Sequence, residues 1–309
     1  VALRCNIVTV STDELPYEEK TIIDHSSSEI STEDAAVLLE AVRKELENDI
    51  YKFYVGTSYR HLTIWDKGEV VDLTPPHDVL GQKIGQYLPK DDKLREMMKK
   101  SYDILSNHPI NVERMKRGLN PANSLWFWGA GTRPMLTSFE EKTGHKGAMI
   151  SAVDLLKGIA VGAGMKVIEV EGANGGLDTN YEGKADAAVD VLLNGGCDFA
   201  YIHLEAPDEM GHQGSYERKV KAIENLDKRI IKRVVEKMEA AGEDFRMLVL
   251  PDHPTPVAIR THVSDPVPYM LYDSTDKKNN TWSYNEKDGE ASGNYIAEGH
   301  TIINRLFEK

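Results

Sequence analysis

Aspartate and histidine residues gather at three places in the C-terminal half of the sequence. They are Asp208 with His212, the pair Asp252-His253, and His262. Carboxylates and neutral imidazoles are ligands that suit Zn²⁺, Mn²⁺ or Fe²⁺. Two such ions held close together can bind both the attacking and the leaving oxygen of a phosphoryl group. The five residues therefore predict a two-metal site for phosphoryl chemistry.

Short apolar runs precede the first two of these groups. Phe199 to Leu204 comes shortly before Asp208, and Met247 to Leu250 comes shortly before Asp252. In an open α/β sheet, ligands bind in the crevice beyond the carboxyl ends of the strands. We therefore expect the two groups to meet in one crevice.

A single histidine in a loop is most simply a polar surface residue without a special role. We keep that interpretation for His25, His108 and His300, and we interpret His203, inside an expected strand, as a core histidine. The set that begins with Asp208 is different, because its members follow strands and are followed by Pro-rich turns.

The region after about Asn120 alternates apolar runs with helical segments. Short apolar runs separated by helices are typical of a largely parallel sheet with helices on both faces. The clearest helix covers about Tyr216 to Ala240 and is apolar on one face only. The expected strands are Ser124 to Phe127, Ala148 to Ile150, Met165 to Val170, Phe199 to Leu204, Met247 to Leu250 and Tyr269 to Tyr272. Residues 121–309 are thus predicted to form an α/β domain.

The region before Asn120 predicts a smaller α+β domain over residues 1–120. Ser31 with Asp34 is a capping pattern that marks the start of a helix. The expected elements are that helix as far as Leu46, strands at Tyr51 to Val55 and Tyr59 to Trp65, a candidate strand at Glu69 to Leu73, and a charged helix from about Lys90 to Asn107. Gly118 to Pro121 reads as a linker and sets the predicted boundary near Asn120.

The composition excludes several classes of protein. Hydrophobic residues make up 40% and charged residues 28% of the 309 residues, which is typical of a packed globular protein. The formal net charge of -13 disfavours nucleic acid and anionic membranes as partners. No apolar run reaches the ~18 residues of a membrane-spanning helix. Cys5 and Cys197 are the only cysteines, so no disulfide framework is expected and a reducing cytoplasm is the predicted location.

The ordered motifs resemble those of one enzyme family. Asp208 to His212, then Asp252-His253, then His262 followed by Asp265-Pro-Val-Pro, are similar to the C-terminal metal motifs of cofactor-independent phosphoglycerate mutases in the alkaline phosphatase superfamily. The archaeal-type branch is indicated by four more motifs: Leu3-Arg-Cys-Asn6, Tyr59-Arg-His61, Pro75-Pro-His-Asp78 and Trp126-Phe-Trp-Gly-Ala-Gly131. The resemblance therefore runs through nearly the whole chain, and it implies a glycolytic isomerase that interconverts 3-phosphoglycerate and 2-phosphoglycerate.

The resemblance also implies how the metal ligands are shared out. By motif, Asp208, His212 and His262 would hold one divalent ion, and Asp252 with His253 would help to hold a second. The ion is usually Mn²⁺ in this family, with Zn²⁺ and Mg²⁺ as alternatives.

Five more residues are implied to act on a small phosphorylated three-carbon acid. Lys142 matches a lysine that touches the transferring phosphoryl group, where a cation offsets negative charge. Arg4, Arg60 and His77 in the small domain and Arg133 beside the hinge are candidates to grip the substrate, because guanidinium groups match phosphate and carboxylate. The alternative for Lys142 and for each arginine is an ordinary solvated surface residue.

In this family a metal-activated serine takes the phosphoryl group, the glycerate reorients, and the phosphoryl group returns to the 2-hydroxyl. A lid domain excludes water meanwhile, and residues 1–120 match that lid. The family's serine and one aspartate of the second metal site lie before the lid, whereas this chain begins at the lid and has no initiator Met. We therefore expect a fragment that lacks part of the phosphatase sheet and is inactive by itself.

Two other functions remain open at this stage. The same scaffold could serve a phosphotransferase or phosphatase that passes the phosphoryl group to homoserine or to water, because metal ligands do not distinguish these acceptors. A truncated module without catalytic activity, such as a regulatory subunit, is the third hypothesis. The glycine-rich segment Gly172 to Gly176 lacks Gly-Lys-Ser/Thr, so we interpret it as a turn and not as a phosphate loop.

Overall fold

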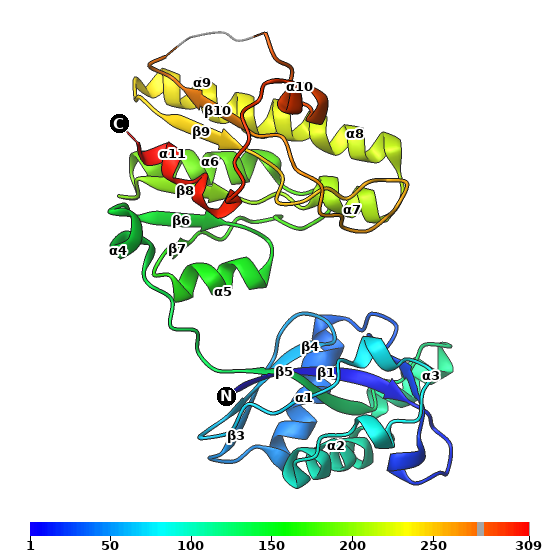
Figure 1. Cartoon of the computed structure of the whole chain (residues 1–309). Coiled ribbons are helices and arrows are strands. Elements are labelled where there is room, and N and C mark those ends of the chain that lie inside the picture. Colours follow the sequence, from blue (N-terminus) through cyan, green and yellow to red (C-terminus); the bar gives the residue numbers. More distant parts are fainter. Residues whose placement is uncertain (277–280, 309) are drawn as a thin grey trace. The chain divides into compact units, whose positions relative to one another are not determined.

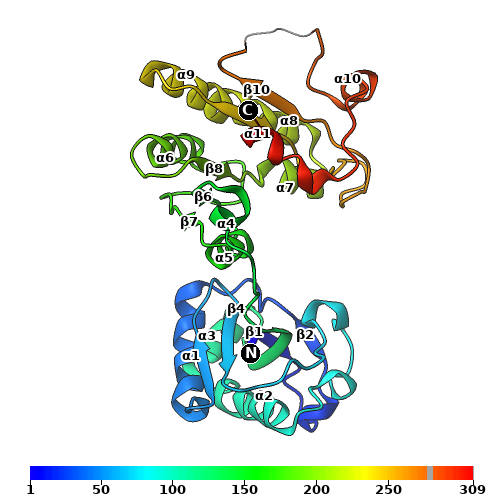
Figure 2. The ribbon, with the colours of Figure 1, turned by 60° about the vertical axis from the view of Figure 1, so that its left-hand side comes forward.

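A computed structural model of the chain describes residues 1–276 and 281–308. The chain divides into two compact units, Val1–Pro134 and a second that begins at Met135. Figure 1 and Figure 2 show the elements of each unit in two views. We call them unit 1 and unit 2.

Unit 1 is built on a five-stranded antiparallel sheet. The strands are β2 (Ile22–Asp24), β1 (Ala2–Val10), β4 (Arg60–Trp65) and β3 (Tyr51–Tyr54) in that order, with β5 (Ser124–Gly131) also paired to β1. The helices are α1 (Thr32–Leu46), α2 (Asp92–Leu105) and α3 (Pro109–Lys116). Ser31 caps α1 by accepting a hydrogen bond from the backbone N–H of Asp34, which confirms the predicted helix start.

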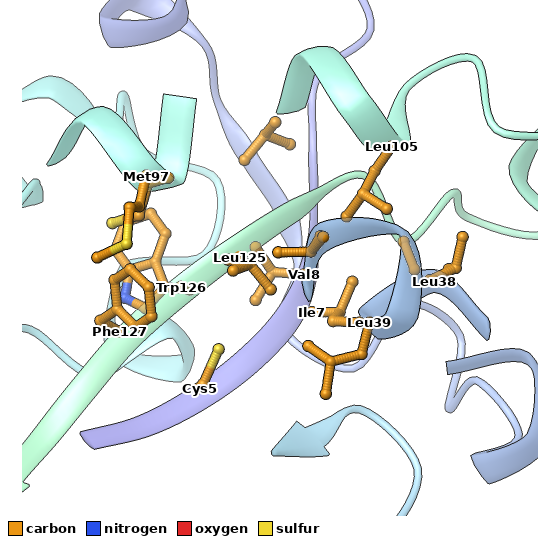
Figure 3. Close-up of a cluster of buried hydrophobic side chains, with 14 of the residues drawn as sticks. Cys5, Ile7, Val8, Leu38, Leu39, Met97, Leu105, Leu125, Trp126 and Phe127 are labelled. Carbon is orange, nitrogen blue, oxygen red and sulfur yellow. The ribbon is translucent and has the colours of Figure 1, made fainter. Parts of the chain in front are cut away.

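The core of unit 1 lies between the sheet and its helices. Leu38 and Leu39 from α1, Met97 from α2 and Trp126 from β5 belong to one buried cluster, which Figure 3 shows around β1. Three of the four tryptophans of the chain, Trp65, Trp126 and Trp128, are in this sheet. Trp126 is fully enclosed, and its indole N–H donates to the carbonyl oxygen of Thr74.

Two predictions for this region need correction. The division between the units lies after Pro134 and not near Asn120. The reason is that Ser124–Gly131, which the sequence predicts as a strand of the second domain, pairs with β1 of unit 1. The candidate strand at Glu69 to Leu73 does not form; that segment has no regular secondary structure.

One buried histidine should make unit 1 sensitive to acid. Burial lowers the pKa of His61 from 6.5 to about 4, and its Nδ1 accepts a hydrogen bond from the backbone N–H of Gly56 at 3.2 Å. The unfolded chain binds a proton near pH 6.5 and the folded chain does not, so stability should fall as the pH drops from 6.5 towards 4. We expect a loss on the order of 1 kcal/mol per pH unit in that window.

Urea unfolding of the wild type and of His61→Phe at a series of pH values tests this. The variant loses the Gly56 hydrogen bond at every pH, so its stability should be lower but flatter between pH 7 and pH 4.5. A wild-type curve that is equally flat would show that His61 does not control this dependence.

Unit 2 contains two separate sheets among its described residues. The first is parallel, in the order β7 (Lys166–Val167), β6 (Gly147–Ile150) and β8 (Phe199–Ile202). The second is an antiparallel pair of β9 (Arg246–Val249) and β10 (Met270–Asp273). The prediction of parallel strands is therefore confirmed for the first sheet and wrong for the second, in which β10 runs back along β9.

The helices of unit 2 include the long one that the sequence predicts. It runs as α8 (Tyr216–Asn225), a π-helical stretch at Leu226–Ile231 and α9 (Lys232–Ala241). The remaining helices are α4 (Phe139–Thr143), α5 (Asp154–Gly162), α6 (Tyr181–Leu193), α7 (Ala206–His212), α10 (Glu286–Ala291) and α11 (Asn304–Phe307). No helix in the described part of the chain has the length and hydropathy to cross a bilayer. Both cysteines are buried free thiols.

Candidate metal centre

The first two predicted ligands lie one helical turn apart on α7. Asp208 and His212 are residues i and i+4 of this helix, so their side chains share one face. The helix directly follows the segment 203–205 at the end of β8, which places both side chains beyond the carboxyl end of that strand.

His262 comes to these two residues from the long loop between β9 and β10. His212 Nε2 lies 3.1 Å from His262 Nε2 and 3.3 Å from Asp208 Oδ2, and His262 Nε2 lies 3.3 Å from Asp208 Oδ1. One ligand atom from each residue can be chosen so that all three lie within 4.8 Å of one another. This is a spacing at which a single ion can be shared.

The backbone fixes which nitrogen of His212 is available. Its Nδ1 lies 3.0 Å from the carbonyl oxygen of Arg260, and a carbonyl oxygen can only accept a hydrogen bond. Nδ1 therefore carries the hydrogen, and Nε2 presents a lone pair to Asp208 and His262. A metal-binding histidine usually donates such a hydrogen bond from the ring nitrogen that does not face the metal.

The last two predicted ligands adjoin the same cluster. The ring of His253 packs against that of His262 in a tilted arrangement with centroids 3.7 Å apart, and His253 Nε2 lies 3.4 Å from Asp252 Oδ2. Asp252 is more exposed than His253 and His262, with 71% of its side chain accessible. The structure thus brings His253 to the cluster of Asp208, His212 and His262, and Asp252 lies beside His253.

The donor set fits a divalent transition metal. Two imidazoles and one carboxylate converge, with the ring of His253 beside them, and nitrogen and carboxylate donors together favour Mn²⁺, Fe²⁺ or Zn²⁺ over ions that bind only oxygen. The Nε2 atoms of His212 and His262 lie 3.1 Å apart, and this close approach of two nitrogens fits their binding to one shared cation.

Two polar residues beside this cluster escaped the sequence interpretation. His203 is not a core residue: it is half-buried, directly follows β8, and has its Nδ1 3.3 Å from Ser151 Oγ, which directly follows β6. Burial lowers the pKa of His203, whereas the nearby Asp252 acts in the opposite direction. For Ser151 the available signal is its position directly after the predicted strand Ala148 to Ile150, whereas His203 lies inside the predicted strand Phe199 to Leu204.

Lys142 is not brought to this cluster. It is an exposed residue of α4, the helix that leads into the amino end of β6. Phe139 of the same helix stacks on Phe199, the first residue of β8, with centroids 4.9 Å apart. Asp208 and His212 follow the carboxyl end of β8, whereas the helix of Lys142 packs at the amino end of this strand. Its contact with a phosphoryl group stays a prediction, one that this placement does not favour.

Three of the predicted substrate residues share one surface of unit 1. The Arg4 guanidinium lies 4.4 Å from the ring centre of Trp128, and the His77 ring is 5.3 Å from the same tryptophan. The Arg60 guanidinium lies 5.0 Å from the ring centre of Tyr59. Cations stacked on aromatic rings keep their hydrogen-bond donors free for an anion.

His25 connects the two halves of this surface. Its ring lies 6.2 Å from that of His77 and 5.7 Å from that of Tyr59. The sequence interpretation treated His25 as an ordinary loop residue, and only the pairing of distant strands brings it here. Arg133 lies in an exposed segment without regular secondary structure.

A glycine in α7 allows the ligand-bearing loop to approach this helix. A Cβ atom on Gly211 would lie 2.4 Å from the carbonyl oxygen of Thr255, closer than any real contact. We therefore expect Gly211→Ala to push the loop away and to lower the free energy of unfolding of unit 2 by about 1–3 kcal/mol. Thermal unfolding followed by circular dichroism measures this.

Gly158→Ala is the matched control for that substitution. Gly158 is also helical, in α5, and a Cβ there meets nothing within 4 Å. It should be neutral or stabilising by up to about 1 kcal/mol. Equal behaviour of the two variants would contradict the close approach at Gly211.

Comparison with known proteins gives a consistent result. Residues 56–298 match the family described as the metalloenzyme superfamily. The chain is 50% identical over 282 residues to the 2,3-bisphosphoglycerate-independent phosphoglycerate mutase of Methanosarcina barkeri, covering 90% of this chain and 68% of that protein. It is 41% identical over 315 residues to a probable 2,3-bisphosphoglycerate-independent phosphoglycerate mutase of Geobacter sulfurreducens, covering 100% of this chain and 77% of that protein.

Solved structures share the fold. A Pyrococcus horikoshii protein superposes with a TM-score of 0.74 at 25% identity, covering 99% of this chain and 72% of that one. A cofactor-independent phosphoglycerate mutase from Thermoplasma acidophilum superposes with a TM-score of 0.61 at 23% identity, covering 99% of this chain and 76% of that one.

Proposed function

Because the chain belongs to the 2,3-bisphosphoglycerate-independent phosphoglycerate mutases of the metalloenzyme superfamily, we propose that it supplies the metal ligands and the substrate-gripping surface for the interconversion of 3-phosphoglycerate and 2-phosphoglycerate. The observation that carries this proposal is the convergence of Asp208, His212 and His262 from two separate segments. Their geometry supports a centre that takes a divalent ion.

The metal centre in this proposal holds two ions, with Mn²⁺ as the first choice and Zn²⁺ or Mg²⁺ as alternatives. Asp208, His212 and His262 would hold one ion, and Asp252 with His253 would contribute to the other. Bound divalent ions supply positive charge to the phosphoryl oxygens and activate a hydroxyl nucleophile. The protein's own part is to keep the imidazole nitrogens deprotonated towards the ions, as the hydrogen bond from His212 to the carbonyl of Arg260 does.

In this proposal, unit 1 binds the substrate and acts as the lid. Arg4, Arg60 and His77 present cationic or hydrogen-bonding groups on one surface, and the rings of Trp128 and Tyr59 hold the two arginines in place. A small acid with a carboxylate and a phosphate needs two separate anion sites, which two spaced guanidinium groups provide. Arg133 is proposed to add a third cation.

We further propose that the nucleophilic serine and an aspartate of the second metal site are not among these 309 residues. Support comes from the split sheet of unit 2. Ile202 of β8 and Met247 of β9 pack on the same apolar cluster, yet within the described residues neither strand pairs with the other. A further strand between them would join the two sheets. On this proposal the 309 residues alone do not catalyse the reaction.

The test is a conversion assay from 3-phosphoglycerate to 2-phosphoglycerate. It compares these 309 residues with the longest product of the parent reading frame, each with Mn²⁺ and with a chelator. Conversion by the longer product that requires metal but no bisphosphoglycerate would support the mutase function. Release of inorganic phosphate, or transfer to homoserine, would identify a different acceptor on the same scaffold, and activity of the 309 residues alone would overturn the proposal about the serine.

A further inference from the structure

Thr255 is a buried polar residue that joins the two groups of ligands. It is 3% exposed and lies two residues after His253 in the loop between β9 and β10. Its hydroxyl is hydrogen-bonded to Asp208 Oδ1 and lies 3.3 Å from His253 Nδ1. One hydroxyl thus touches a residue from the α7 group and a residue from the Asp252-His253 pair.

The single proton of this hydroxyl settles the direction of both hydrogen bonds. A carboxylate oxygen can only accept, so Thr255 donates its proton to Asp208. The oxygen of Thr255 then has only lone pairs to offer to His253, whose Nδ1 must be the donor. His253 is thereby held with its hydrogen on Nδ1 and a free lone pair on Nε2.

The backbone at Thr255 is fixed as firmly as its side chain. Lys219 of α8 donates from Nζ to the carbonyl oxygen of Thr255 at 2.6 Å. The same carbonyl lies against Gly211 of α7, where no larger residue would fit. The loop is therefore held to both helices at the position from which the hydroxyl reaches Asp208 and His253.

We propose that Thr255, held by Lys219, is a positioning residue of the metal centre that orients Asp208 and sets the tautomer of His253. This inference rests on the proposed metal site. It adds the groups that hold the proposed ligands in the orientation and tautomer needed to bind an ion. Outer-shell partners of this kind usually change metal affinity by ~10–100-fold when they are removed.

The experiment compares Thr255→Val with Thr255→Ser in the 309-residue chain. Valine keeps the shape but removes the hydroxyl, whereas serine keeps the hydroxyl. Mn²⁺ binding is measured by electron paramagnetic resonance of the free ion, a readout that does not depend on catalysis. We expect Thr255→Val to weaken binding by ~10–100-fold and Thr255→Ser to bind close to the wild-type value.

The results separate this inference from the metal site itself. Wild-type protein that binds no Mn²⁺ would overturn both. Wild-type binding that is unchanged in Thr255→Val would overturn the inference alone, and so would equal losses in the valine and serine variants, because the hydroxyl would then not be the relevant group.

A second pair of variants tests the inference if Thr255→Val does not fold. Lys219→Met removes the hydrogen bond to the Thr255 carbonyl and should weaken Mn²⁺ binding. Lys221→Met is its control. Lys221 is an exposed residue of the same helix, and its Nζ lies 3.5 Å from Glu224 Oε2. Both variants lose one positive charge, so a general electrostatic effect would act on both. Equal affinities in the two variants would contradict the role of Lys219.

Discussion

His262→Ala should nearly abolish Mn²⁺ binding by this protein. The imidazole contributes a nitrogen that lies 3.1 Å from His212 Nε2 and 3.3 Å from Asp208 Oδ1, and its ring supports His253. On the proposed assignment, one substitution therefore removes a ligand of the first ion and the packing of a ligand of the second. We expect the dissociation constant to rise by more than the ~100-fold that loss of an outer-shell partner causes. Isothermal titration calorimetry with Mn²⁺ measures this.

His300→Ala is the control for that experiment. His300 is an exposed histidine with 75% of its side chain accessible, beside Glu298 and without a place in the cluster. Its removal should leave the affinity unchanged. The far-ultraviolet circular dichroism of both variants should match that of the wild type, because half-exposed ligands contribute little to the core. Tight binding by His262→Ala would mean that the ligand set is wrong.

Asn111→Leu should be the most damaging of the proposed changes for the stability of unit 1. The side chain is completely buried and makes three hydrogen bonds of 2.8 Å: its Nδ2 donates to the carbonyls of Leu105 and Ala122, and its Oδ1 accepts from the N–H of Ala122. Leucine would leave all three backbone groups buried without these partners. At about 1–3 kcal/mol for each such group, and allowing for local relaxation, we expect a loss of about 3–5 kcal/mol.

Urea unfolding of the Asn111 variant is to be compared with that of Lys116→Ala. Lys116 is on the same helix, α3, and forms an exposed ion pair with Glu113 at 3.8 Å. Exposed pairs of this kind contribute about 0–1 kcal/mol. A loss for Asn111→Leu as small as that for Lys116→Ala would show that water replaces the lost hydrogen bonds.

The parts of the fold that the sequence predicts well are those set by local patterns. The cap at Ser31 and the alternation in β4 depend on neighbouring residues, so these elements form where they are expected. The grouping of Asp208 with His212 after β8, and of Asp252 with His253 after β9, is likewise local, whereas the meeting of these groups with His262 is not. The motif around Asp208 and His212 needs only one turn of helix to place both side chains.

The parts that it does not predict depend on which distant strands pair. Ser124 to Phe127 is an apolar run like those of the second domain, and nothing within it indicates that β1 is its partner. The sequence of β10 likewise does not indicate that this strand pairs with β9 in the antiparallel direction. Thr255 and His25 gain their importance only from residues far away in the sequence, so a single sequence offers no signal for either beyond their types.

The uneven placement of tryptophan gives unit 1 most of the fluorescence signal of the protein. Trp65, Trp126 and Trp128 belong to unit 1, whereas Trp282 belongs to unit 2 and is about half exposed. Because the enclosed Trp126 moves into water on unfolding, most of the shift in indole emission should come from unit 1. Loss of helix from α6, α8 and α9 should instead dominate the dichroism signal of unit 2. Because α1, α2 and α3 of unit 1 also contribute to the dichroism, a dichroism transition that does not coincide with the emission transition would report the separate melting of unit 2.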